Sequence, residues 1–125
     1  MKKEVQTEKA PLPIGPYSQA IMIENLIFLS GQIGLNPETG RLIEGGVEEH
    51  TKQIFSNIKA VLNEAGMGLN NVVKVTVFLK DMGYFKRVND IYLDYFEKPY
   101  PARSAVAVKQ LPLNVDVEIE VIACK

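Results

Sequence analysis

The order of the expected elements is the feature that most constrains how this chain can fold. Short strands come first, followed by a long helix, a strand, a second helix and final strands. Apolar side chains recur at steps of three and four residues over 47–65, and again over 84–96. Asp81 is a favourable residue to begin the second helix, and Pro99 ends it. This order predicts an α+β fold, with both helices on one face of a mixed sheet.

The strands are predicted from alternating side chains and from turn residues. Residues 72–79 give the strongest pattern, with Val73, Val75, Val77 and Leu79 expected on one face and Val72, Lys74, Thr76 and Phe78 on the other. The segment "AIMIENLIFLSG" predicts a hairpin that turns at Glu24-Asn25. Further strands are expected over residues 4–8, 104–108 and 115–123.

Two helices can cover only one face of such a sheet, yet the strands are apolar on more than one face. The segments "AVAV", "VVKVTVFL" and "LIFLSG" do not alternate cleanly between apolar and polar residues. A small monomer does not usually expose an apolar area of this size. Burial against copies of itself is the simplest solution, so the pattern predicts a homo-oligomer. The alternative is that N-terminal segments cover the second face.

The composition limits the classes of protein to which this chain can belong. The 125 residues, 46% of them hydrophobic, suit one domain over residues 1–125. A net charge of −1 gives no global field for attracting nucleic acid. The apolar runs are too short to span a bilayer, and the N-terminus shows no secretory signal, so a cytoplasmic location is expected. The single histidine, His50, and the single cysteine, Cys124, make a poor ligand set, and no metal site is expected.

The stretch "KPYPARSAVAV" starts a strand of small apolar residues with Arg103, and Ala105 shares its face. In "VDVEIEVIA", Glu118 and Glu120 lie opposite the apolar face. A guanidinium binds a carboxylate through two hydrogen bonds, and a nearby glutamate can activate a water molecule. If the two strands are neighbours, Arg103 could face Glu118 or Glu120 across a small anion site. The alternatives are a salt bridge at the sheet edge, or two unrelated solvated residues, with no role in function.

Two loops carry further candidates. Tyr17 lies on a rigid segment beside Pro16, where its ring could anchor the loop or its hydroxyl could line a pocket. Ser30 and Gly31 follow an expected strand, and glycine lets the backbone approach a ligand closely. The chain lacks both G-x-G-x-x-G and G-x-S-x-G, so dinucleotide binding and serine-hydrolase chemistry are not predicted.

In combination, "PIGPYSQA", "LSGQIG", "VVKVTVFLKDM" and "PARSAVAVKQLP…VEIEVIA" resemble the reactive-intermediate deaminase (Rid, or YjgF) family, and most closely its RidA branch. The resemblance runs from about Ala10 to the C-terminus. It implies a chorismate-mutase-like fold and a homotrimer whose clefts are each lined by two neighbouring subunits. Members of this branch hydrolyse 2-imino and enamine acids, such as 2-iminobutanoate and 2-iminopropanoate, to 2-oxo acids and ammonia. They need no cofactor or metal, and they serve in metabolite damage control.

The resemblance also suggests roles for individual residues. Arg103 would bind the substrate carboxylate, and Glu118 would position the attacking water. Ala105 is expected to line the substrate cleft and to keep it open. It stands where some members have cysteine, so thiol-based activities are not expected. A ribonuclease and a non-catalytic metabolite-binding regulator remain as alternatives, although the near-neutral charge and single histidine argue against the ribonuclease. The loop residues placed in the same pocket are Tyr17, Ser30 and Gly31.

Overall fold

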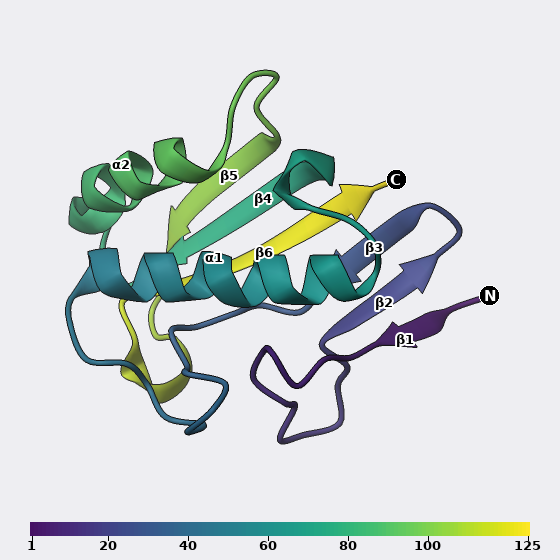
Figure 1. Cartoon of the computed structure of the whole chain (residues 1–125). Helices are drawn as coiled ribbons and strands as arrows, with labels where there is room; N and C mark the ends of the chain where they lie inside the picture. Colours follow the sequence, from purple (N-terminus) through teal and green to yellow (C-terminus); the bar gives the residue numbers. More distant parts are fainter.

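In the computed structural model, which describes residues 1–125, six strands form one mixed sheet and two helices lie on the same face of it (Figure 1). The strands are β1 (Lys3–Val5), β2 (Ala20–Ile23), β3 (Leu26–Leu29), β4 (Val72–Leu79), β5 (Ala102–Ala107) and β6 (Val117–Cys124). The helices are α1 (Val47–Glu64) and α2 (Phe85–Tyr95). The predicted α+β architecture is confirmed. Neither helix is long and apolar enough to cross a membrane.

The strand order in the sheet is β1-β2-β3-β6-β4-β5. Every neighbouring pair is antiparallel except β4 and β5, which are parallel. A parallel pair requires a crossover, and α2 supplies it from the helical side (Figure 1). As a result β6, the last strand in sequence, lies inside the sheet, whereas β5 forms one of its edges.

The core lies between the sheet and α1. Strand β4 from Lys74 onward and strand β6 along its length alternate, and each directs one set of side chains toward the helices. Fully burying such an aliphatic side chain contributes about 1.5–3 kcal/mol, so this layer is a major source of stability. The buried residues of the layer include Val75, Val77, Leu79, Val117, Ile119, Val121, Ile54, Phe55 and Ile58.

The start of β4 departs from the predicted alternation. Val72 is buried at 6% exposure and Val73 is 46% exposed, which is the reverse of the expected faces. A register shift between Val72 and Lys74 in the pairing with β6 is the cause, because an extra residue in one strand reverses the faces on one side of the bulge. From Lys74 onward the predicted faces are confirmed.

Three other boundaries differ from expectation. β1 ends at Val5 rather than at residue 8, and β5 starts at Ala102, two residues earlier than expected. β6 begins at Val117 rather than at residue 115. The hairpin turn at Glu24-Asn25 is confirmed, with Glu24 in a left-handed conformation at φ 52°. Asp81 does act as a cap, but for the short turn Met82–Tyr84 that precedes α2.

The face of the sheet away from the helices carries partly exposed apolar side chains. Ile23, Leu26, Phe28 and Val106 are 40–44% exposed. β1 pairs edge to edge with β2, so it widens the sheet instead of covering this face. An apolar strip of this kind favours association with another copy of the chain.

We propose that the protein forms the homotrimer that the family resemblance implies. Phe28→Glu should then shift it toward the monomer, because a buried unpaired charge opposes association. Light scattering at micromolar concentration measures the mass of both proteins. Met82→Glu is the matched control, since Met82 is 47% exposed and lies in the turn before α2. A wild-type monomer, or an unchanged trimer in Phe28→Glu, would contradict the expectation.

Candidate functional site

A cavity of about 670 Å³ brings most of the predicted site residues together. Its lining combines the N-terminal loop, the segment after β3, the turn before β6 and the polar face of β6. Apolar side chains, Ile14 and Leu113 among them, form part of its wall. Polar and small residues at the cavity are Tyr17, Ser30, Gly31, Gln32, Glu118 and Glu120.

Glu118 is placed by the alternation along β6. Its neighbours Val117 and Ile119 are fully buried on the helical face, so Glu118 lies on the other face, where it is partly buried. Its carboxylate lies directly against Gly31, and a Cβ atom added to Gly31 would collide with it. In one chain it is therefore a side chain of the protein itself, and not a ligand, that lies close to the Gly31 backbone. Only glycine fits at this position without moving Glu118.

Residues 30–32, which follow β3, are hydrogen-bonded to β6 on one side and to the loop that carries Tyr17 on the other. The Gln32 amide donates to the Ile119 carbonyl at 2.8 Å, and the Ile119 amide donates back to Gln32 at 3.1 Å. On the other side, the Ser30 hydroxyl donates to the Ser18 carbonyl at 2.6 Å, and the Ser30 amide donates to the Gln19 carbonyl at 2.9 Å. The Ser30 side chain thus links β3 to the loop that carries Tyr17.

Gln19 holds that loop in place, and sequence reasoning missed it. The residue is 1% exposed. Its side-chain oxygen accepts from the Thr7 amide at 2.8 Å, and its side-chain nitrogen donates to the carbonyls of Thr7 and Pro11 at 3.0 and 2.8 Å. A buried amide that satisfies irregular backbone fixes a loop that has no strand or helix of its own. The available signal was a long amide side chain directly before an apolar strand.

The carboxyl group of Glu118 has an altered affinity for protons. Burial raises its pKa above the ordinary value for glutamate, and the negative charge of Glu120 raises it further. The two side chains lie on the same face of β6, two positions apart. A carboxyl group with a raised pKa in a cavity is suited to exchange protons with a bound molecule.

Arg103 lies elsewhere, at a second cavity of about 360 Å³ beside α2. It pairs with Val75 across the parallel β4–β5 ladder, so its side chain is on the helical face of the sheet. Its Nη1 donates to Oδ1 of Asn89 at 2.7 Å. Its guanidinium carbon lies 4.6 Å from the ring centre of Tyr92 and 5.1 Å from that of Phe85.

The prediction that Arg103 faces Glu118 or Glu120 within one chain is wrong. Strand β4 lies between β5 and β6, and both glutamates pair with β4 residues on the face away from the helices. The alternative of an edge salt bridge is also wrong, because the ion pairs of the chain do not include Arg103. Those pairs are Lys52–Glu49, Lys86–Asp90 and Arg87–Glu48.

Ala105 does not line either cavity. It pairs with the buried Val77 and packs, partly buried, against the hydrophobic core. Tyr17 does line the larger cavity and is 53% exposed, which favours a pocket position over a role as a buried anchor.

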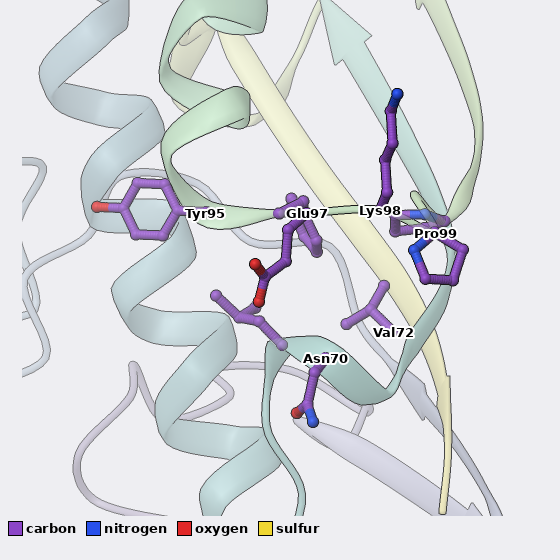
Figure 2. A pocket seen from close by; sticks show the side chains of 9 residues that line it. Asn70, Val72, Tyr95, Glu97, Lys98 and Pro99 are labelled. Atoms are coloured by element: carbon purple, nitrogen blue, oxygen red, sulfur yellow. The ribbon is translucent and has the colours of Figure 1, made fainter.

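A third cavity of about 180 Å³ lies at the end of α2 (Figure 2). It contains none of the predicted residues. Lys98 extends away from the other labelled side chains, and the Tyr95 hydroxyl also points away from them (Figure 2). No group of three or more histidine, cysteine, aspartate or glutamate side chains is arranged to hold a metal ion anywhere in the chain. Apart from Ala105, the predicted site residues therefore lie at the two cavities that hold Glu118 and Arg103.

Comparison with known proteins places the chain in a family. A family model described as Endoribonuclease L-PSP matches residues 7–125. The RutC family protein PYRAB12510 of Pyrococcus abyssi is 54% identical over 124 residues, which cover 99% of this chain and 98% of that protein. The 2-iminobutanoate/2-iminopropanoate deaminase of Mus musculus is 50% identical over 123 residues, covering 98% and 91%. The crystal structure of YyfA from Yersinia pestis, a Rid-family protein, has a TM-score of 0.97 and 47% identity over the full length of both chains. The chain therefore belongs to the YjgF/Rid family.

Proposed function

We propose that this protein is a deaminase that hydrolyses 2-imino and enamine acids, such as 2-iminobutanoate and 2-iminopropanoate, to 2-oxo acids and ammonia. Relatives about half identical in sequence carry the name of this activity. The observation that carries the proposal is the presence of two suitable groups, Arg103 and Glu118. Arg103 is a cation with no carboxylate partner, and Glu118 is a carboxyl group with a raised pKa at a cavity.

Arg103 would bind the carboxylate that all these substrates share. A guanidinium presents parallel N–H groups that match the two oxygens of a carboxylate. Since no acidic side chain of the chain occupies this arginine, its charge remains available to a ligand. Arg103 is also exposed on an edge strand, where a small anion can reach it.

Glu118 would position the attacking water and accept its proton. A protonated imine is strongly electrophilic at C2, so the reaction depends chiefly on orientation. Glu118 accepts a proton from water as the water oxygen bonds to C2, which gives a tetrahedral amino alcohol. Glu118 returns the proton to the nitrogen and then accepts the hydroxyl proton, which lets the C–N bond break. Ammonia leaves as the C2 carbonyl of the 2-oxo acid forms.

One chain cannot present both groups to one small substrate, because they lie at different cavities on opposite faces of the sheet. We propose that the site is completed between two copies in a homotrimer. One copy supplies Arg103, and its neighbour supplies the cavity with Tyr17, Gly31 and Glu118. The uncovered apolar face of the sheet supports this association.

A direct assay separates this proposal from its rivals. An amino-acid oxidase generates the imine in place, and the rate of 2-oxo acid semicarbazone formation reports whether the protein accelerates hydrolysis. The description of the family model raises the rival activity of a ribonuclease, so the same preparation is incubated with RNA. RNA cleavage without faster imine hydrolysis would overturn the deaminase. Ligand binding without either activity would indicate a metabolite-binding regulator.

Arg103→Ala should weaken binding of 2-oxobutanoate at least tenfold. A hydrogen bond to a charged group is worth about 1.5–3 kcal/mol, and each 1.4 kcal/mol is about a factor of ten in affinity. Arg103→Lys should recover only part of the loss, because an ammonium lacks the planar fork. Titration calorimetry measures the affinities. A loss of thermal stability with unchanged binding would show that Arg103 is structural.

Glu118→Gln should lower turnover by about 10²–10⁴-fold, which is the usual contribution of a general base, while 2-oxobutanoate still binds. It should not lower the melting temperature at pH 7. Because the folded-state pKa of Glu118 is raised, its contribution to stability is present at low pH and is lost as the pH rises through that pKa. Glu120→Gln is the matched variant on the same face. If it abolishes turnover while Glu118→Gln is near wild type, the roles are reversed.

The pH dependence of kcat/KM should show a loss of activity on acidification, since Glu118 must be ionised to accept a proton. The midpoint should lie above the ordinary pKa of glutamate, because burial raises the pKa. Glu120→Gln should move this midpoint to lower pH by removing the second cause of the shift. An acid limb that stays in place in Glu120→Gln would show that another group controls it.

A further inference from the structure

We propose that Asn89 is a positioning residue for Arg103, and that with the ring faces of Phe85 and Tyr92 it holds the guanidinium in the orientation that receives a substrate carboxylate. This inference rests on the proposed function, because it concerns the same arginine. Asn89 shows no sequence pattern of its own and was not among the predicted site residues.

Arg103 needs such support because of where it lies. It is an exposed residue on the edge strand β5, and a long flexible side chain loses rotamer entropy when a ligand immobilises it. Residues 85, 89 and 92 are spaced by four and three positions along α2, so they share one face of the helix. That face lies beside the start of β5 and contacts the guanidinium from more than one side.

The contacts orient the arginine without neutralising it. The amide oxygen of Asn89 accepts one Nη1–H at 2.7 Å and carries no charge. This leaves the Nε–H and Nη2–H pair, which is one of the edges that binds a carboxylate through two hydrogen bonds. A carboxylate in place of Asn89 would hold the arginine equally well. However, that carboxylate would neutralise the charge of the guanidinium and repel an anionic substrate.

The aromatic part of this support is rigid. The Tyr92 ring is 4% exposed and packs 4.5 Å from the ring of Phe96, measured between ring centres. Its hydroxyl is buried without a hydrogen-bond partner, so packing alone holds the ring. Asn89, Tyr92 and Arg103 line the same cavity of about 360 Å³. A carboxylate that enters this cavity therefore meets a guanidinium that is already oriented, which reduces the entropic cost of binding.

A double-mutant cycle with 2-oxobutanoate as the probe tests this inference. Calorimetry on the full chain measures the dissociation constant for wild type, Asn89→Ala, Arg103→Ala and the double variant. We expect Asn89→Ala to weaken binding about threefold to tenfold, as part of a charge-assisted hydrogen bond is lost. In the Arg103→Ala background the same change should have no effect, because Asn89 acts only through the guanidinium.

Two further variants separate positioning from folding. Asp90→Ala changes the next residue of α2, which pairs with Lys86 on the exposed side, and should bind like wild type. Asn89→Asp keeps the size and the acceptor oxygen, so the fold is preserved, yet it should bind more weakly than Asn89→Ala because its charge competes with the ligand. A purely structural role for Asn89 predicts the opposite order.

The outcomes distinguish this inference from the proposed function. If Arg103→Ala leaves binding intact, the carboxylate anchor itself fails. If Arg103→Ala weakens binding but Asn89→Ala does not, the anchor stands and the positioning role is overturned. Equal losses from Asn89→Ala in both backgrounds would also overturn it, because Asn89 would then act independently of the arginine.

Discussion

The antiparallel pairing of β4 with β6 is the interaction on which the rest of the structure depends. Along both strands, alternate side chains enter the core beneath α1, and the residues between them face the other side of the sheet. A slip of one residue in β6 would bring Glu118 and Glu120 into the core and expose Val117 and Ile119. The hydrophobic pattern therefore fixes the register and, with it, the position of the carboxylates.

Several weak constraints converge on the larger cavity. Glu118 is carried by a strand with neighbours on both sides, whereas Tyr17 lies on a loop with no regular structure. The loop is nonetheless well defined, because Gln19 satisfies its backbone and Ser30 ties it to the end of β3. Gly31 then allows the carboxylate of Glu118 to lie against the backbone. Substituting Gln19 or Ser30 would disturb the cavity without touching the carboxyl group, whereas any side chain at Gly31 would displace it.

The periodicity of apolar side chains predicted those helices and strands whose formation depends on residues close together in the sequence. The helix over 47–65 and the strand over 72–79 follow from side-chain periods, and both are present within one residue. The bulge at Val72–Lys74 depends on the partner strand, so no period in the sequence reveals it. The prediction that Arg103 faces Glu118 was wrong because it also depends on strand order, and β4 lies between β5 and β6. Asn89 resembles any polar residue of a surface helix until β5 is placed beside it.

The central position of β6 has a consequence for biosynthesis. The strands β1–β3 and the pair β4–β5 make no backbone ladder with each other, and only β6 joins them. The chain emerges from the ribosome with its N-terminus first, so strands β1–β3 and the pair β4–β5 emerge before β6, which joins them. Until then β3 and β4 each have an open edge, which is a template for pairing with other chains. A nascent chain of this protein therefore stays exposed to aggregation, and in need of a chaperone, until residues 117–124 have emerged.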